Sequence, residues 1–280
     1  MVTKERMNTP AQMRPTLGTT SYGFRYQLLD PRLAPTLESL VEQTRRAGLD
    51  ALQICENARP LSVSPEQWQR VVRLAADHGV ALTLGCMTLD LETLRQYLER
   101  AAAVPDASML RIVLEDDSGR GVPRPAIERF VEQAAALAAD AGLTLVFENH
   151  FHVPCRVLAE VATQYPPEVA AFCVDSANSL RNWESPAHVF ETLGSRAAFF
   201  HLKDYRVRGS NVGFEVVGAP LGEGDLDLQA TLAAIGRHAS PTVFLENWVP
   251  ATGDRDADVA ADADWLARSR EALCRRLAGE

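Results

Sequence analysis

Short runs of apolar residues alternate with longer amphipathic segments along almost the whole chain. The apolar runs predict eight strands, at residues 16–21, 49–55, 80–85, 109–114, 143–148, 169–175, 197–203 and 242–246. The segments between them repeat apolar residues with the period of an α-helix, which predicts helices at about residues 33–47, 65–79, 91–103, 123–141, 153–164, 186–193, 227–238 and 261–277. Ser64 and Ser185 support two of the helix starts, because each stands before a proline suited to the first turn. A glycine leads from a helix into the next strand at three places: Gly48, Gly79 and Gly142.

Eight strand–helix units without a linker or a break in composition predict a (β/α)8 TIM barrel. The length of 280 residues agrees with this fold, since such barrels typically have about 250 residues. We therefore expect one catalytic domain over residues 15–280, preceded by a flexible tail over residues 1–14. The alternative is an open, doubly wound sheet, but no predicted strand is followed by the glycine-rich phosphate loop that is typical of that fold.

Several of the predicted strands end on a polar residue that can bind a metal ion. Three end on the dipeptide Glu-Asn, and two others end on an aspartate or place a histidine near their end. Strands five to eight thereby supply Glu148, Asp175, His201 and Glu246. The carboxyl ends of parallel strands meet at one face of a barrel, so these four side chains should converge. Three carboxylates beside one imidazole would repel one another without a cation, which predicts one divalent metal ion: Mn2+, with Co2+ and Mg2+ as alternatives.

The same strands predict which residues line the barrel, because side chains alternate between the two faces of a strand. If the four candidate ligands point inward, so do the residues two or four positions away: Thr144, Val146, Ala171, Cys173, Phe199, Lys203, Thr242 and Phe244. Phe147, Phe200 and Leu202 should then pack against the helices.

Each candidate also has a structural alternative. Asp175 could cap a helix, His201 could be a core histidine, and Glu246 could pair with an arginine. Glu56, which ends the second strand on another Glu-Asn, could contact a substrate or form a structural ion pair. The acidic segment 115–117 after the fourth strand is predicted to be a solvated loop.

The composition narrows the class of protein. A formal net charge of −9 and a pI of about 5.3 argue against a nucleic-acid surface, which needs a basic patch. No apolar stretch approaches the ~18 residues of a membrane span, and the polar first fourteen residues do not resemble a signal peptide. The five cysteines are odd in number, widely spaced and without a CxxC motif, which predicts a reducing compartment and a cytoplasmic protein.

Five sequence blocks carry a resemblance to a known family: Glu148-Asn149-His150, Val174-Asp175-Ser176-Ala177-Asn178, His201-Leu202-Lys203-Asp204, Gly222-Glu223-Gly224-Asp225-Leu226-Asp227 and Leu245-Glu246. As a set, they resemble the signature of the sugar phosphate isomerase/epimerase family, the xylose isomerase-like TIM barrels, over residues of about 16 to 250. The resemblance implies that Glu148 and Glu246 bind the metal and also carry the proton, while Asp175 and His201 complete the ligand set.

One departure from the family bears on substrate and activity. Endonuclease IV and the ketose 3-epimerases that the chain resembles place a histidine three residues after the strand-six aspartate, where this chain has Asn178. Endonuclease IV also needs further histidines for its three zinc ions, and three of the six histidines here fall on predicted helices. A role in DNA repair is therefore not expected, and Asn178 indicates a different substrate geometry from those epimerases.

We expect an enzyme that isomerises or epimerises a keto-sugar or polyol by proton transfer through a metal-stabilised enediolate. The alternative is a metal-dependent lyase or dehydratase that acts on a keto-polyol or keto-acid through the same enolate, which a cationic pocket of Lys203, Arg206 and Arg208 would favour. A non-catalytic sugar-binding barrel would not need two opposed carboxylates on a metal. The partner is a small molecule, and assembly into a homo-oligomer is left open. The predicted substrate contacts are His150, Asn178, Lys203, Arg206, Glu56 and Trp248; Lys203 could instead form an ion pair that closes the barrel.

Overall fold

The computed structural model describes residues 15–116 and 121–279, and within them eight parallel strands form a closed barrel. The barrel strands are β1 (Thr16–Thr20), β2 (Ala51–Ile54), β3 (Ala81–Met87), β4 (Met109–Val113), β5 (Thr144–Glu148), β6 (Ala170–Asp175), β7 (Ala197–Leu202) and β10 (Thr242–Leu245). Each pairs with its neighbours in chain order, and β10 closes the barrel against β1. The TIM-barrel prediction is therefore confirmed, and every predicted strand lies within two residues of an observed one. The predicted tail over residues 1–14 lies outside the described residues.

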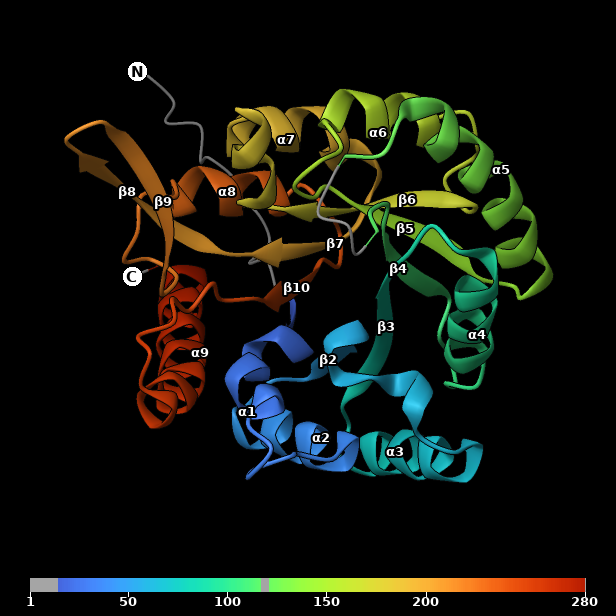
Figure 1. Cartoon of the computed structure of the whole chain (residues 1–280), viewed down its shortest axis with the longest axis horizontal. Helices are drawn as coiled ribbons and strands as arrows, with labels where there is room; N and C mark the ends of the chain where they lie inside the picture. Colours follow the sequence, from blue (N-terminus) through green and yellow to red (C-terminus); the bar gives the residue numbers. More distant parts are fainter. Residues whose placement is uncertain (1–14, 117–120, 280) are drawn as a thin grey trace, which may run out of the picture.

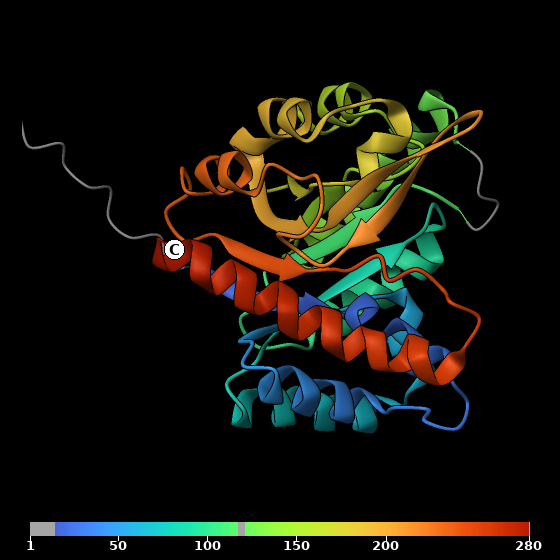
Figure 2. The same cartoon turned by 90° about the vertical axis from the view of Figure 1, so that its left-hand side faces the viewer.

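Helices surround the strands on the outside of the barrel (Figure 1). They are α1 (Arg25–Leu29), α2 (Leu37–Arg46), α3 (Pro65–Asp77), α4 (Leu91–Ala102), α5 (Arg124–Asp140), α6 (Cys155–Ala162), α7 (Pro186–Leu193), α8 (Leu228–Ile235) and α9 (Arg255–Ala278). Figure 2 shows α9 as one long helix along the side of the molecule. None of the helices in the described residues is both long and apolar enough to cross a membrane.

The helix limits follow the local signals in the sequence. Ser64 Oγ accepts a hydrogen bond from the backbone N–H of Gln67, and the side chain of Gln67 accepts one from the N–H of Ser64, so α3 begins with a capping box. Gly48, Gly79 and Gly142 have φ values of 70°, 65° and 69°, which a side chain would disfavour.

Two helix starts differ from the prediction by four residues or more. Helix α2 begins only at Leu37, because Pro35 precedes it and Thr36 caps its first turn. Helix α9 begins at Arg255, six residues before the predicted start, because Asp254 caps a first turn whose polar residues give no apolar period.

The segment after β7, which the sequence shows as a long insertion, contains an antiparallel hairpin of β8 (Asp204–Ser210) and β9 (Gly213–Ala219). The carboxylate of Asp204 fixes the loop that follows, since it accepts backbone hydrogen bonds from Gly222, Gly224 and Leu226. This contact explains the conformation of the Gly-Glu-Gly-Asp block.

The two faces of the strands bury different residues, as the alternation predicts. The barrel interior holds a small apolar cluster of Ala51, Val146, Ala171, Cys173, Phe199 and Phe244. Phe147, Phe200 and Leu202 belong instead to the large cluster that includes the helices. The predicted orientation of strands β5, β6, β7 and β10 is therefore confirmed. This orientation carries the residues at their carboxyl ends into the mouth of the barrel.

Candidate active site

The four predicted metal ligands form one buried cluster at the mouth of the barrel. Each offers a ligand atom, and these atoms from Glu148, Asp175, His201 and Glu246 all lie within 4.8 Å of one another. The imidazole is central: its Nδ1 lies 3.3 Å from Oε1 of Glu148, 3.5 Å from Oε2 of Glu246 and 3.9 Å from Oδ2 of Asp175. No side chain of the four is more than 8 % exposed. Among the residues described, this cluster can hold a metal ion.

Unsatisfied polar atoms in the cluster test whether a cation fits there. Both ring nitrogens of His201 are buried without a hydrogen bond; Oδ2 of Asp175 also makes no hydrogen bond, although the ammonium of Lys203 lies 3.1 Å from it. Buried polar atoms without partners are costly, and a shared cation would satisfy them. Three carboxylates and one imidazole suit a hard divalent ion better than a thiophilic one. The donor set therefore fits a divalent metal ion.

Asp175 also binds the backbone that follows it, although Ala177 and not Asp175 stands at the N-cap of the short 3-10 helix Asn178–Asn182, so the predicted helix cap is not formed as such. Its Oδ1 accepts hydrogen bonds of 2.8 Å from the backbone N–H groups of Ala177 and Asn178, while its Oδ2 faces the cluster. The asparagine that follows Glu148 has a structural part as well. The side chain of Asn149 bonds both the N–H and the C=O of Asp175, which ties the ends of β5 and β6 together. These hydrogen bonds, to the backbone of residues 177 and 178 and from Asn149, fix the position of the Asp175 carboxylate.

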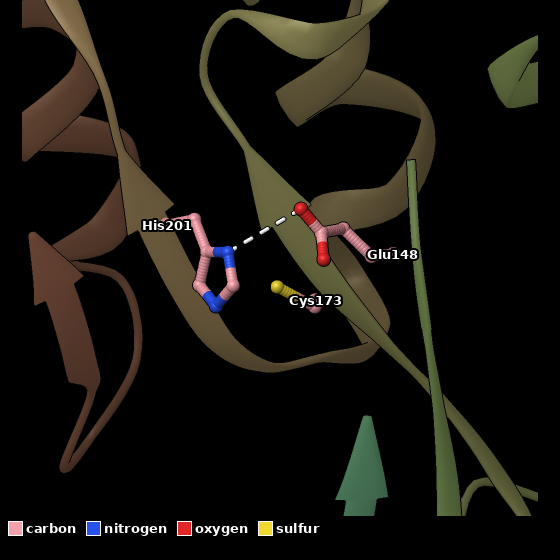
Figure 3. A group of neighbouring side chains, drawn as sticks. All are labelled: Glu148, Cys173 and His201. Carbon is pink, nitrogen blue, oxygen red and sulfur yellow. Dashed lines mark ion pairs between the residues drawn. The ribbon is translucent and has the colours of Figure 1, made fainter. Parts of the chain in front are cut away.

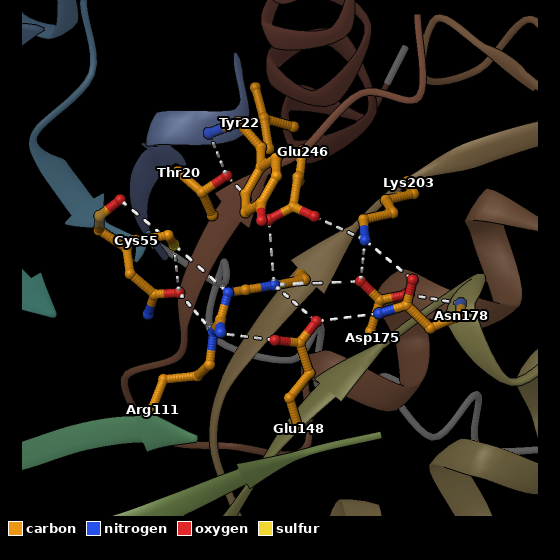
Figure 4. A network of polar contacts seen from close by, with 12 residues as sticks. Thr20, Tyr22, Cys55, Arg111, Glu148, Asp175, Asn178, Lys203 and Glu246 are labelled. Atoms are coloured by element: carbon orange, nitrogen blue, oxygen red, sulfur yellow. Dashed lines mark hydrogen bonds and ion pairs between the residues drawn. The ribbon is translucent and has the colours of Figure 1, made fainter. Parts of the chain in front are cut away.

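The ammonium of Lys203 lies among the same carboxylates (Figure 4). Its Nζ is 2.6 Å from Oε1 of Glu246, 3.1 Å from Oδ2 of Asp175 and 3.0 Å from Oδ1 of Asn178. Nζ also lies 5.2 Å from the centre of the Trp248 ring, a cation–π contact at the edge of the cavity. The lysine thus forms ion pairs and also lines the cavity, so both predicted roles remain open to it.

Arg111 on β4 is a central residue of the site that the sequence analysis missed. Its Nε lies 2.9 Å from Oε2 of Glu148, and its Nη1 lies 3.6 Å from Oε2 of Glu56. The guanidinium is almost completely buried, and Gly85 on β3 leaves the space for it, since a Cβ there would lie 2.9 Å from Nε. The sequence did contain a signal: Arg111 alternates with Leu110 and Ile112, which pack outward, so its side chain has to enter the barrel.

The charges set the protonation of the two proton-carrying candidates. Burial alone would raise the pKa of the Glu148 carboxyl, but the charges of Arg111 and His201 outweigh burial and hold the pKa well below its usual value. Burial likewise opposes ionisation of Glu246, yet Lys203 lowers the pKa of that carboxyl. Both glutamates are therefore ionised at neutral pH and can accept a proton.

The predicted solvated loop at residues 115–117 is wrong for Glu115, whose side chain is buried. Its Oε2 lies 2.9 Å from Nδ1 of His150 and 3.0 Å from Nδ1 of His152, and its Oε1 accepts the N–H of His152. Burial raises the pKa of Glu115, but the bonds with His150 and His152 reverse the effect and lower it to about 2. The sequence could not show this, because the histidines come from the loop after the next strand. Asp117 lies outside the described residues.

The remaining predicted substrate contacts fall into three groups. Glu56, His150 and Trp248 line the same cavity of about 430 Å³ as Glu148 and Glu246. Asn178 is buried behind the ligands and donates a hydrogen bond of 2.9 Å to Oε1 of Glu148. Arg206 is not among the described residues that line the cavity: it is exposed on β8 and donates to the carbonyl of Glu223. The structure does not bring Arg206 to the site.

Comparison with known proteins places this geometry in a family. A family model described as xylose isomerase-like TIM barrel matches residues 41–269, which confirms the resemblance found in the sequence. The 3-oxo-isoapionate decarboxylase of Pectobacterium atrosepticum is 25% identical over 264 residues, which span 93% of this chain and 95% of that protein.

Solved structures share the fold at low sequence identity. The IOLI protein with a bound zinc atom has a TM-score of 0.72 and 12% identity, over 94% of this chain and 98% of that chain. The D-psicose 3-epimerase of Clostridium cellulolyticum H10, solved with D-tagatose, has a TM-score of 0.67 and 17% identity, also over 94% and 98%.

Proposed function

The chain belongs to the xylose isomerase-like TIM barrel family, and on this basis we propose that it is a metal-dependent isomerase or epimerase of a keto-sugar or polyol. The observation that carries the proposal is the pair of carboxylates, Glu148 and Glu246, which both lie within 3.5 Å of Nδ1 of His201 in one buried cluster. A simple binding barrel has no need for two such groups at one point. The reaction class is therefore proton transfer at a carbon next to a carbonyl group.

The four clustered residues would hold the metal ion, with Mn2+ as our first expectation and Co2+ or Mg2+ as alternatives. When bound, a divalent ion supplies a Lewis acid that polarises the substrate carbonyl and so acidifies the adjacent C–H. The zinc of the IOLI protein belongs to that neighbour and leaves the choice of metal here to experiment.

The chain's own residues would handle the proton. One of the two carboxylates accepts the proton from the carbon, and the other returns a proton to the opposite face or to the neighbouring carbon. Asn178 and Arg111 orient Glu148 through its two oxygens, while Thr20 and Lys203 orient Glu246 in the same way. Fixed carboxylates of this kind keep the geometry that proton transfer needs.

The residues that line the cavity would select a neutral, polyhydroxylated substrate. Among the described lining residues, five carboxylates face three cations, namely Glu56, Glu115, Asp116, Glu148 and Glu246 against Arg25, Arg111 and Lys203. One bound dication would leave this lining close to neutral, which favours a sugar over an acid. His150 and Glu56 would accept or donate hydrogen bonds to hydroxyl groups, and Trp248 would pack on an apolar sugar face.

The second candidate is a lyase that acts on a keto-acid, either a dehydratase or a decarboxylase. The observation that favours it is the similarity to 3-oxo-isoapionate decarboxylase, whose name describes an acid substrate that loses carbon dioxide. The cationic pocket that would support it is weaker than the sequence predicted, because Arg206 and Arg208 are exposed on the β8–β9 hairpin and do not line the cavity.

One screen separates the two candidates. The protein with Mn2+ is incubated in D2O with keto-sugars, inososes and 3-oxo-acids, and deuterium incorporation, carbon dioxide release and water loss are each recorded. Label in a recovered or isomerised sugar supports the isomerase. Carbon dioxide release, or water loss from a keto-acid or keto-polyol, supports the lyase. Since all five cysteines are free, we also propose that the protein works in a reducing compartment, the cytoplasm.

A further inference from the structure

Cys173 lies directly beneath the candidate metal cluster, inside the barrel. It precedes Asp175 by two residues on β6 and therefore points to the same face. Its register partner across the sheet is Glu148. The side chain is completely buried, and the sulfur is not in a disulfide. No part of the proton-transfer proposal uses this thiol.

Cys173 and two residues beside its thiol form a second group of metal-binding atoms (Figure 3). The Sγ of Cys173, a carboxylate oxygen of Glu148 and a ring nitrogen of His201 all lie within 4.8 Å of one another. Two of the three also belong to the four-residue cluster above. The two groups therefore share Glu148 and His201 and differ only in their remaining ligands.

We propose that Glu148, Cys173 and His201 form a distinct site for a thiophilic divalent ion such as Zn2+ or Cd2+. One sulfur, one nitrogen and one oxygen are a ligand set that zinc accepts, and three protein ligands leave its fourth position open. The four-residue cluster, with its three carboxylates, suits hard ions instead. The chain thus offers two overlapping positions that differ in the kind of metal they prefer.

The ring nitrogens of His201 support this assignment. His201 has no hydrogen-bond partner at either ring nitrogen, so its ring is free to bind a metal at either position. When a metal–sulfur bond forms, the S–H bond breaks and its proton passes to solvent. The thiolate and one carboxylate then balance the charge of the dication.

The shared ligands make the two positions mutually exclusive. An ion held by Cys173 occupies Glu148 and His201 and prevents a hard ion from using them. We therefore expect Zn2+ and Cd2+ to displace Mn2+ and to inhibit the protein, and we expect a strong chelator to reverse the effect.

The test uses metal ions alone, so its outcome does not depend on the proposed reaction. All variants carry Cys274→Ser, which removes the cysteine that is partly exposed. Cd2+ is titrated into this parent, into Cys173→Ser and into a matched control, Cys55→Ser. Cys55 is equally buried, but its sulfur lies 3.3 Å from Nη2 of Arg111 and belongs to neither metal group. The readouts are the ultraviolet thiolate-to-cadmium band and the 113Cd chemical shift.

The parent and Cys55→Ser should bind one Cd2+ per chain with the band of a single thiolate, and Cys173→Ser should lose the band. Mn2+ binding, followed by electron paramagnetic resonance, should persist in Cys173→Ser, which shows that this variant is folded and keeps the carboxylate cluster. A band of equal strength in Cys173→Ser overturns the proposal. If that variant does not fold, the parent decides: a 113Cd shift typical of oxygen and nitrogen ligands alone overturns it as well.

Discussion

The ammonium nitrogen of Lys203 lies 2.6 Å from a carboxylate oxygen of Glu246, one of the two proposed proton carriers. Nζ also lies 3.1 Å from Asp175, so a cation of the chain itself stands at the edge of the proposed metal position. The position of Lys203 has two opposite effects on the site. Lys203 keeps Glu246 ionised, and it also repels any metal ion that binds nearby.

We predict that Lys203→Met binds Mn2+ more tightly than the unsubstituted protein, by about tenfold, because a neighbouring positive charge is removed from the cluster. The same change should lower the activity, since Glu246 loses an orienting partner. Mn2+ binding can be followed by calorimetry or electron paramagnetic resonance. Arg206→Met is a matched control, because this cation is exposed on β8 and should leave the affinity unchanged. Weaker binding in Lys203→Met would mean that the lysine supports the metal site.

We predict about one divalent ion per chain in the purified protein, and its loss from His201→Ala and Asp175→Ala. His201 lies between the three carboxylates, so its removal leaves no nitrogen ligand in the cluster. Metal content by plasma mass spectrometry, after dialysis against trace metals, is the measurement. His188→Ala, on the exposed side of α7, should keep the metal. Equal content in His201→Ala and His188→Ala would show that the ligand assignment is wrong.

Arg111 should be essential for both stability and activity. Arg111→Met leaves Glu148 and Glu56 without their buried cation, which we expect to lower the free energy of unfolding by about 3–5 kcal/mol. It also frees Glu148 from the charge that lowers its pKa. Denaturant unfolding measures the first effect. Arg111→Lys keeps the charge but loses the planar fork, so its loss of stability should be smaller. Equal losses in both variants would mean that the shape of the guanidinium, and not its charge, is what matters.

Arg111 and Glu115 mark the limit of what the sequence could predict. Strand periodicity correctly predicted the barrel, its inward residues and the four clustered side chains, because each of these depends on the local order of one strand. Arg111 stands in an apolar strand, and its partners come from two other segments: Glu56 from the turn after β2 and Glu148 from the end of β5. Glu115 is buried only because His150 and His152 cover it. Contacts between distant segments of this kind leave no period in the sequence. The loop after the β8–β9 hairpin was not predicted for the same reason. Its conformation depends on Asp204, which accepts hydrogen bonds from three backbone groups about twenty residues further along the chain.

Asp262 should make the stability depend on pH. Burial raises the pKa of this carboxyl in α9 to about 7, despite hydrogen bonds from the N–H groups of Tyr26 and Gln27. Because the pKa is higher in the folded state than in the unfolded one, Asp262 is protonated in the folded state but ionised in the unfolded state between about pH 4 and pH 7. This residue therefore costs stability above pH 7, and the cost disappears as the pH falls through that window.

Asp262→Asn removes the charge and keeps an oxygen that can accept the same backbone bonds. Relative to the unsubstituted protein, it should be more stable at pH 8, by up to about 4 kcal/mol, and by only about 1 kcal/mol at pH 4.5. Urea unfolding at a series of pH values measures the difference. A difference that does not change between pH 4.5 and 8 would show that Asp262 is ionised throughout. Asp264→Asn, on the exposed side of the same helix, should show little dependence.

The last prediction concerns the route of the hydrogen. If Glu148 or Glu246 accepts it as a proton, the carboxylic acid that forms stands at the mouth of the barrel beside a cavity open to water. The proton can exchange with solvent before it returns. Deuterium should therefore enter one carbon of the recovered substrate or product in D2O, with no nicotinamide present. Glu148→Gln and Glu246→Gln should still fold, because glutamine keeps a side-chain oxygen for the partners of each glutamate, and should lose activity by roughly 10²-fold or more, the usual effect of removing a general base.

The two variants should also differ from each other. Where exchange and turnover use different carboxylates, one variant should still exchange the substrate hydrogen with solvent while it no longer forms product. Mass spectrometry of the recovered substrate distinguishes exchange from turnover. A hydride shift within the substrate would give product without label over many turnovers. It would also leave exchange absent in both variants, and that result would exclude the two-carboxylate mechanism while leaving the barrel and the metal site intact.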